Sequence, residues 1–365
     1  MTLSCIHFDE GCSGCSLNKS LDNPPIIQEA NYFFNSEFNY NLPFLKGNLS
    51  GWRKRVKLAV RGTPKNPIIG LFKEKSHDAL DIASCQMHDL RINEAVARVK
   101  EWILKEGIEP YTELGHGLLR YIQLMVEENT GEIQLTLVLN SQELPNLDSL
   151  KGGWHSLWVN FNTLKTNTIF SNCWQKVEGK DWLFEKINQK IFPLSPSYFS
   201  QSNPRVYEKA VQDIYDNVAG THALEFYGGV GTIGLSLVDK LSSLVITEIN
   251  EEAKEGFLIA KNQLLPLDQK KVEFTVLDAK EGSSILQGKD LVIVDPPRKG
   301  LATQLLADLL KSKDLKTLVY LSCGFDSFKR DSVQIKKGGF ELAFAKSYLF
   351  FPGTNHIETL AIFKR

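Results

Sequence analysis

Strand and helix patterns alternate along the second half of the chain, and this alternation limits the fold more than any other feature. Asn203 and Pro204 form an N-cap and first-turn pair that opens a helix, which Gly220 ends. Short apolar runs and helical patterns then follow each other, with strands predicted at 223–227, 244–247, 272–276, 291–294 and 317–321 and helices from 232, at 251–264 and at 303–310. This order is typical of a doubly wound α/β sheet.

The first half of the chain has a different texture, so we expect two domains, at 1–190 and 191–365. A predicted hairpin at 117–140 and an amphipathic helix at 93–108 indicate an N-terminal mixed α+β lobe. Residues 51–67 hold six basic residues and no acidic one. They predict a strand with a cationic face that contacts RNA phosphates, the alternative being a solvated strand face. That face would comprise Arg53, Lys54, Arg55, Lys57 and Arg61.

The charges of the whole chain nearly cancel, with 42 Lys and Arg against 43 Asp and Glu. This balance excludes a protein held on nucleic acid by bulk charge, although an enzyme with a local basic patch stays open. No apolar run approaches the length of a membrane-spanning helix, and residues 1–10 lack the basic and apolar regions of a secretory signal. We therefore expect a cytoplasmic protein without a membrane partner.

Glycines follow the first predicted strand of the α/β half, in the sequence Glu225-Phe-Tyr-Gly-Gly-Val-Gly231. Gly229 and Gly231 allow a ligand to approach the backbone at a helix N-terminus, where N–H groups are free. Glu248 ends the next strand, where a carboxylate can bond both ribose hydroxyls, and Asp278 ends the one after, where it can face an adenine amino group. The turn alone fits NAD and S-adenosylmethionine about equally well.

Reactive side chains also lie at later strand ends. Asp295-Pro-Pro-Arg298 follows the strand at 291–294, Cys323 follows the strand at 317–321, and Glu358 precedes the last strand. A dehydrogenase has no evident need for the Asp-Pro-Pro element. Arg298 stands where methyltransferases of exocyclic amines carry a stacking aromatic, which argues against amine methylation. A single cysteine such as Cys323 is more often a core residue than a nucleophile.

Four cysteines of the N-terminal lobe predict a metal site. Cys5, Cys12 and Cys15 lie within eleven residues, and Cys85 follows farther along the chain. Disulfides are a poor explanation in a reducing cytosol. The Cys-x-x-Cys pair lets two thiolates face one metal, and two more ligands would complete a zinc or iron–sulfur site. Spacing alone does not choose between these metals, and a redox pair or coincidence is the alternative.

Together these motifs resemble the RNA 5-methyluridine methyltransferase family, whose members methylate tRNA or large-subunit ribosomal RNA. The resemblance covers nearly the whole chain. It rests on the segment Pro196-Ser-Tyr-Phe-Ser-Gln-Ser-Asn203, the glycine turn, Asp295-Pro-Pro-Arg298, Ser322-Cys323, His356-Ile-Glu358 and the four cysteines. It implies S-adenosylmethionine as the cofactor and RNA as the partner. In the ribosomal branch, cysteines in these places hold a 4Fe–4S cluster, which the resemblance assigns to Cys5, Cys12, Cys15 and Cys85.

The resemblance also implies residue roles. Cys323 would add to C6 of uracil as a thiolate with a depressed pKa, and Glu358 would remove the C5 proton. Asp295 would bond the uracil edge or the cofactor, and Gln201 would lie beside the transferred methyl group. The predicted cofactor-binding set comprises Gln201, Tyr227, Gly229, Gly231, Glu248, Asp278 and Asp295.

The chain departs from the family pattern in three places. Gly324-Phe325 follow Cys323 where the family usually has Asn-Pro, Glu225 replaces an Asp, and Gly228 replaces a common Cys. Because Cys323, Asp295 and Glu358 are kept, we still expect an active enzyme. We also expect it to be a monomer.

The expected substrate is uridine in structured RNA, first of all 23S rRNA. The chain starts at the cysteine cluster without a preceding small β-barrel, which resembles the shorter ribosomal enzymes. Methylation of the tRNA T-loop is the nearest alternative. A non-catalytic RNA-binding or ribosome-assembly factor with the same fold is another, and a flavin- or nicotinamide-linked oxidoreductase is a weaker third.

Overall fold

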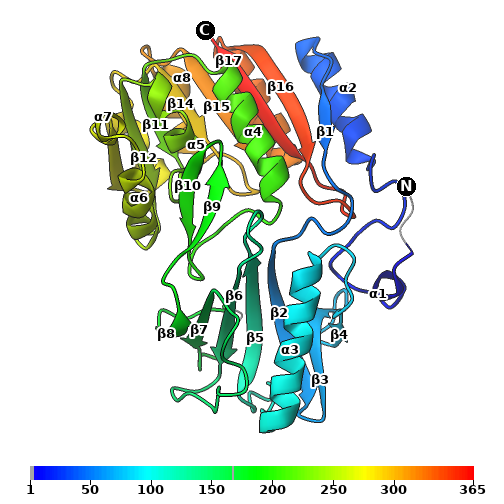
Figure 1. The fold of residues 1–365 in the computed structure, drawn as a ribbon. Helices are drawn as coiled ribbons and strands as arrows, with labels where there is room; N and C mark the ends of the chain where they lie inside the picture. Colours follow the sequence, from blue (N-terminus) through cyan, green and yellow to red (C-terminus); the bar gives the residue numbers. More distant parts are fainter. Residues whose placement is uncertain (1–3, 167) are drawn as a thin grey trace.

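The computed structural model describes residues 4–166 and 168–365, which form two bodies stacked along the long axis of the molecule (Figure 1). One body is an eight-stranded sheet with helices on both faces, drawn uppermost in Figure 1. The other is a seven-stranded sheet with a single long helix across one face. A two-stranded hairpin, β9 (Leu183–Ile187) and β10 (Lys190–Leu194), connects the seven-stranded sheet to the first helix of the second half of the chain.

The eight-stranded sheet confirms the α/β fold expected from the alternation. Its order is β1-β16-β17-β15-β14-β11-β12-β13, in which β13, β12, β11, β14 and β15 run parallel and β17 runs antiparallel to both its neighbours. The strands from the second half of the chain are β11 (His222–Phe226), β12 (Ser243–Glu248), β13 (Val272–Val276), β14 (Leu291–Val294), β15 (Thr317–Ser322), β16 (Glu341–Leu349) and β17 (Glu358–Lys364).

Helices from the same half cover both faces of this sheet. They are α4 (Pro204–Asn217), α5 (Thr232–Ser236), η1 (Val238–Lys240), α6 (Ala253–Asn262), α7 (Pro266–Gln269), η2 (Ala279–Ile285), α8 (Thr303–Lys311) and α9 (Phe325–Lys337). Successive residues of each strand point to opposite faces. Ala223 therefore packs in a core with α4 and α6, whereas Leu224 packs in a second core with α8 and α9. These two cores fix the strand ends that carry the candidate site.

Two elements from the start of the chain also belong to this body. The strand β1 (Phe44–Lys46) pairs in parallel with β16, with Phe44 opposite Ser347. The helix α2 (Ile26–Phe38) packs on α9, where the ring of Phe34 stacks on Phe328 with centroids 5.6 Å apart. The first 190 residues therefore do not all build one lobe.

The seven-stranded sheet forms the body of the N-terminal lobe and has the order β4-β3-β2-β5-β6-β7-β8. Its strands are β2 (Arg55–Thr63), β3 (Asn66–Phe72), β4 (Ala79–Asp81), β5 (Leu119–Val126), β6 (Ile133–Leu139), β7 (Ser156–Phe161) and β8 (Trp174–Gly179). The helix α3 (Leu90–Glu106) covers one face, and Asp89 caps it by accepting a hydrogen bond from Arg91 N. A short helix, α1 (Ile6–Asp9), starts the described chain.

None of the helices within residues 4–166 and 168–365 combines the length and the hydrophobicity that crossing a lipid bilayer requires.

Candidate functional site

The turn between β11 and α5 has the geometry of a ligand cradle. Tyr227 takes a φ of +60°, which is strained for a residue with a side chain, and Gly229 takes +54°. No atom lies within 4 Å of the position that a Cβ of Gly229 would occupy, so the backbone there faces open space. Glu225 is buried, and its Oε2 accepts a hydrogen bond from Gly234 N at 3.0 Å. Glu225, which stands where the resembling family has an Asp, thus caps α5, and burial raises the pKa of Glu225 to about 8.

Two acidic residues stand at the ends of the next strands, as predicted. Glu248 ends β12, where its Oε2 accepts from Gly229 N at 3.1 Å and its Oε1 accepts from Asn250 N at 2.9 Å. Asp278 follows β13 and caps η2 by accepting from Lys280 N at 3.0 Å. Both side chains are partly exposed, and Glu248 lies directly beside the turn through its bond to Gly229.

Asp295 follows β14, Cys323 follows β15, and Glu358 begins β17. These three strands are neighbours in the sheet, and the three residues stand at the same end of it. The sequence places them almost 65 positions apart, and the fold brings them within electrostatic reach of one another. The Sγ of Cys323 lies 3.8 Å from the carbonyl oxygen of Pro296. A small cavity of about 150 Å³ opens beside it, lined by Cys323, Arg298 and His356 among others.

The electrostatics of this group differ from the expectation. Burial, followed by Glu358 and Asp295, raises the pKa of Cys323 to about 11, and Arg298 offsets only part of the rise. The predicted depressed pKa is therefore wrong, because the thiol is partly buried and two acids face it. Burial also raises the pKa of Asp295 to about 7 and that of Glu358 well above its ordinary value.

The departure after Cys323 has a steric reason. A Cβ on Gly324 would lie 2.5 Å from the carbonyl oxygen of Arg298, so only glycine lets these two loops approach. The hydroxyl of Ser327 donates to Arg298 O at 2.8 Å and to Gly324 O at 2.9 Å, which ties the loops together. Phe325 packs on Phe328 in the core. Gly324 and Phe325 thus hold the loop after Cys323 close to the Asp295-Pro-Pro-Arg298 element.

The segment with Gln201 is held by the N-terminal lobe. Gln123 Nε2 donates to Pro196 O at 3.0 Å, Arg55 Nε donates to Ser200 Oγ at 3.0 Å, and Lys54 N donates to Ser202 O at 2.8 Å. Gln201 lies between these anchors with its side chain partly exposed. Sequence reasoning missed Gln123 and the internal role of Arg55, because no local pattern links positions more than 70 residues apart.

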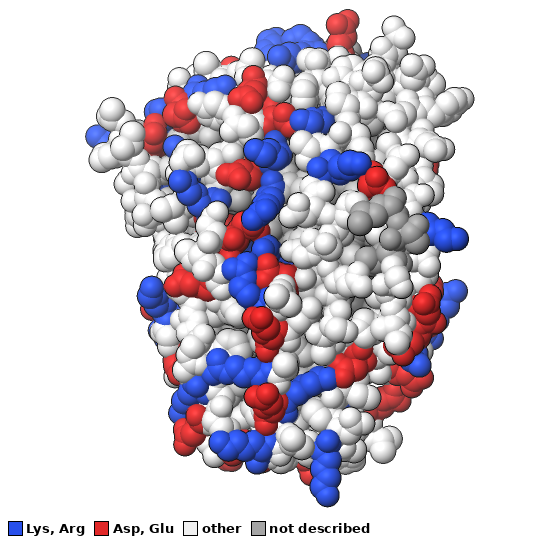
Figure 2. Space-filling model, turned by 45° about the vertical axis from the view of Figure 1, so that its right-hand side comes forward, with Lys and Arg blue, Asp and Glu red and all other residues white. Residues whose placement is uncertain are grey.

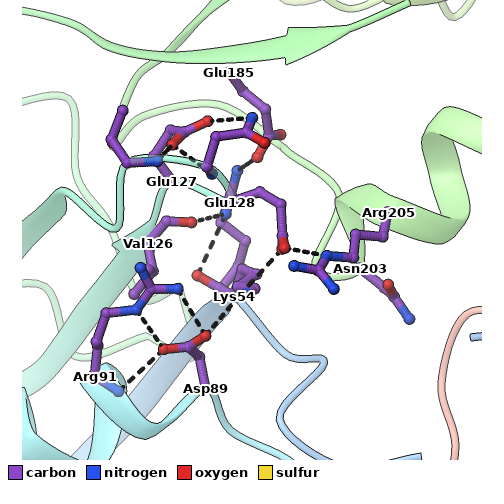
Figure 3. A network of polar contacts seen from close by, with 12 residues as sticks. Lys54, Asp89, Arg91, Val126, Glu127, Glu128, Glu185, Asn203 and Arg205 are labelled. Carbon is purple, nitrogen blue, oxygen red and sulfur yellow. Dashed lines mark hydrogen bonds and ion pairs between the residues drawn. The ribbon is translucent and has the colours of Figure 1, made fainter. Parts of the chain in front are cut away.

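The cationic face predicted on β2 is wrong for Lys54 and Arg55, although the strand itself is present. Lys54 is buried and pairs with Asp89 Oδ2 at 2.5 Å and Glu128 Oε2 at 3.1 Å (Figure 3). Arg55 is buried and pairs with Glu185 Oε1 at 2.8 Å. These acids lie far along the chain, so the local excess of positive charge is neutralised inside the fold.

Three other cations of that run contact aromatic rings, and of these Lys57 remains exposed. Arg61 donates to two backbone carbonyls and stacks over Tyr111, at 5.4 Å from the ring centroid. Lys57 lies over Phe170 at 4.6 Å, and Arg53 packs over Trp52 at 4.6 Å. On the face that Figure 2 shows, Lys and Arg are interspersed with Asp and Glu rather than gathered in one patch.

The four cysteines of the N-terminal lobe line one cavity of about 480 Å³, and all four are free thiols. Burial raises the pKa of Cys15 to about 12, and the other three cysteines add to the rise, as expected for thiols that face one another. Within the described residues, however, no three His, Cys, Asp or Glu side chains lie close enough together to hold one metal ion. The four cysteines predicted as ligands thus line one cavity, and the described residues show no metal site there.

Comparisons with known proteins agree with this geometry. The chain is 42% identical to an uncharacterized RNA methyltransferase of Protochlamydia amoebophila, across 100% of this chain and 98% of that protein. It is 31% identical to an uncharacterized RNA methyltransferase of Clostridium acetobutylicum, across 86% of this chain and 71% of that protein. No protein-family model matches the chain.

A solved structure has the same fold over almost the entire chain. It is the tRNA (uracil-54, C5)-methyltransferase of Pyrococcus abyssi in complex with S-adenosyl-L-homocysteine, with a TM-score of 0.82 and 26% identity. The superposition covers 97% of this chain and 86% of that one. With the two sequence relatives, this likeness shows that the chain belongs to the RNA methyltransferase family.

Proposed function

We propose that the protein methylates C5 of uridine in a structured RNA, with S-adenosylmethionine as the methyl donor. The meeting of Cys323, Asp295 and Glu358 at the ends of three strands carries this proposal, because C5 methylation needs a nucleophile and a base at one place. The solved neighbour, which acts on a uracil C5 position in tRNA, supports the same chemistry.

The cradle beside β11 fits the methyl donor. Gly229 leaves room for a ligand, and the carboxylates of Glu248 and Asp278 stand where ribose hydroxyls and an adenine amino group need acceptors. Tyr227, Gly231, Gln201 and Asp295 complete the proposed binding set. S-adenosylmethionine supplies an electrophilic methyl group when it is bound.

The residues of the chain divide the chemistry between them. C5 of uracil is a poor nucleophile, so the Cys323 thiol first loses its proton to solvent and its sulfur bonds to C6, which makes C5 electron-rich. After C5 has received the methyl group, Glu358 takes the C5 proton, and the thiolate leaves C6 as the double bond re-forms. Burial and Asp295 raise the pKa of Glu358, which makes its ionised carboxylate a stronger base. The uracil must leave its stack to reach Cys323.

The RNA substrate is 23S rRNA in our proposal, and tRNA is the second candidate because the solved neighbour acts on tRNA. Mapping 5-methyluridine in total RNA with and without the gene distinguishes these substrates. Loss of the nucleoside from 23S rRNA alone supports the first candidate, and loss from tRNA alone supports the second. RNA without any change in 5-methyluridine would favour a non-catalytic RNA-binding factor.

We also propose that the cavity lined by Cys5, Cys12, Cys15 and Cys85 holds a 4Fe–4S cluster. In such a cluster each thiolate binds a different iron, so the ligands surround a space, whereas zinc needs them to converge on one point. The four thiols line the same cavity, which supports the cluster. Anaerobically purified protein should contain about four iron per chain, and stoichiometric zinc without iron would contradict the proposal.

The covalent step has a direct test in Cys323→Ala and Glu358→Gln. Cys323→Ala should bind RNA and form neither adduct nor product. Glu358→Gln should still transfer the methyl group and then stall as a methylated protein–RNA adduct that survives denaturing electrophoresis, because an amide cannot take the proton. Cys173→Ala is the matched control, since Cys173 is exposed and lies outside the site. Full activity of Cys323→Ala would overturn the mechanism.

A further inference from the structure

The segment that carries the first cysteines contacts the loop that leads to Glu358. Ser16 N and Leu17 N both donate to Gly353 O at 2.9 Å, and Asn355 N donates to Ser16 Oγ at 3.1 Å. These three bonds connect parts of the chain more than 300 positions apart. The cysteine segment is therefore bonded directly to the loop that leads to Glu358.

One of the cysteines lies against the same loop. Gly353 is buried with a φ of +90°, and a Cβ there would lie 3.0 Å from the Sγ of Cys15 and 3.6 Å from the Sδ of Met87. A side chain would be strained in this backbone conformation and would press on the thiol. The glycine thus allows the loop and the cysteine segment to fit together.

Apart from the bonds to this loop, the cysteine segment is held mainly by polar contacts to the lobe, which include bonds of Ser4, His7 and Ser13. The helix α1 between Cys5 and Cys12 contributes no buried residue to a core. Its other attachments include a single β-bridge from Cys12 to Lys73 and a bond from Glu74 N to Gly11 O at 3.0 Å. A segment with so few buried apolar contacts opens easily unless ligands fix it. Four thiols bound to one group would supply that fixation.

We propose that the segment Cys15-Ser16-Leu17 is a strap that positions the loop 350–357 and, through this loop, Glu358. A group bound in the cysteine cavity thereby changes the rate at which Glu358 removes the proton. Ser16 is the positioning residue of this strap. The link to proton removal rests on the proposed function, whereas the link between cavity and loop rests on the contacts alone.

Hydrogen exchange of the loop tests the second link without any assay of activity. We expect residues 350–358 to exchange faster after a chelator has removed iron from the anaerobically purified protein, while the glycine turn at 225–235 keeps its rate. In the untreated protein, Ser16→Ala should speed exchange at 350–358 about fivefold, as for the loss of one hydrogen bond. Unchanged exchange at 350–358 in Ser16→Ala would overturn the strap.

A substitution on the loop tests the coupling from the other side, since coupling between two sites is reciprocal. Gly353→Ala should lose iron to a chelator about tenfold faster than the unmodified protein, although Gly353 is no ligand. Gly339→Ala is the matched control, because Gly339 has a φ of +86° and nothing within 4 Å of its Cβ position. Equal iron loss from Gly353→Ala and Gly339→Ala would overturn the coupling.

Adduct kinetics separate a positioning role from a general loss of stability. Ser16→Ala should form the protein–RNA adduct at the normal rate and release product more slowly, whereas Ser16→Thr, which keeps the hydroxyl, should restore release. Slower formation with normal release would contradict a role through Glu358. If the unmodified protein forms no adduct, the proposed function fails, and the exchange measurements still decide whether the strap holds the loop.

Discussion

Arg55 on β2 donates a hydrogen bond from Nε to the hydroxyl of Ser200, 3.0 Å away, in the other half of the molecule. The same guanidinium pairs through Nη2 with Glu185 and donates through Nη1 to Val126 O. A side chain expected to face RNA thus fixes the segment with Gln201. The fork of an arginine is needed for this, because a single ammonium group cannot reach three acceptors in different directions.

Arg55→Lys and Ser200→Ala should each weaken binding of S-adenosylmethionine about tenfold, the effect expected from one lost charge-assisted hydrogen bond. Titration calorimetry without RNA measures this. Combining the two changes should add little, because both remove the same contact. Arg205→Gln is the control, since Arg205 pairs with Glu128 instead and is 66% exposed. Additive effects would show that Arg55 does not act through Ser200.

Alkylation of Cys323 by iodoacetamide should rise about tenfold per pH unit between pH 7 and 9, because a pKa of about 11 leaves about one thiol in ten thousand ionised at pH 7. Asp295→Asn should speed alkylation at pH 8.5. At that pH Asp295, with a pKa of about 7, is ionised, and removing its negative charge lowers the pKa of the thiol. Peptide mass spectrometry follows Cys323, with exposed Cys173 as the internal reference. A plateau near pH 7 would contradict the raised pKa.

Gly324→Asn, which restores the residue usual in the resembling family, should lower the rate of adduct formation at least about tenfold. The new Cβ would meet Arg298 O at 2.5 Å and Ser327 Oγ at 2.8 Å and push the two loops apart, an overpacking cost of about 1–3 kcal/mol. Trapping with RNA that contains 5-fluorouridine measures the rate. Gly107→Asn is the control, because a Cβ there meets no atom within 4 Å. Equal rates for Gly324→Asn and the unmodified protein would contradict the packing argument.

Lys54→Ala should lower the free energy of unfolding by about 3 kcal/mol, because it removes the buried cation between Asp89 and Glu128 and leaves these acids only the more exposed Arg91 and Arg205. Arg205→Ala, which removes an exposed partner of the same Glu128, should cost no more than about 1 kcal/mol. Urea denaturation compares the two variants. A similar loss in both would mean that burial does not set the cost in this network.

Local patterns in the sequence predicted the elements that local physics determines. The glycine turn and the strand ends of Glu248, Asp295 and Cys323 followed from apolar runs and turn residues, and the structure has them there. The partners of Lys54 could not be predicted, because Asp89 and Glu128 reach it only after the lobe has folded. The resemblance suggested a depressed pKa for Cys323. The sequence could not correct this expectation, because only the folded chain shows which acids are buried around the thiol.

The contact between Ser16 and Gly353 was also beyond sequence reasoning. No periodicity or motif relates the two positions, and the cysteines were assigned to the N-terminal lobe. The resemblance identified the four cysteines as a group, but the neighbours of that group depend on how α2 and β1 return the chain to the larger sheet.

The pairing of β1 with β16 has a consequence for synthesis on the ribosome. The strand at 44–46 meets its partner only when residues 347–349 emerge, about 300 residues later. At about 5–20 residues per second, the early strand waits roughly 15 to 60 s with its edge unpaired. The lobe from β2 to β8 can fold during this interval. The eight-stranded sheet, between whose strands β1 and β11 this lobe is inserted in the sequence, is completed last. Such late closure by a distant edge slows folding and leaves an open strand that can pair with other chains, which makes the nascent protein a candidate for chaperone assistance.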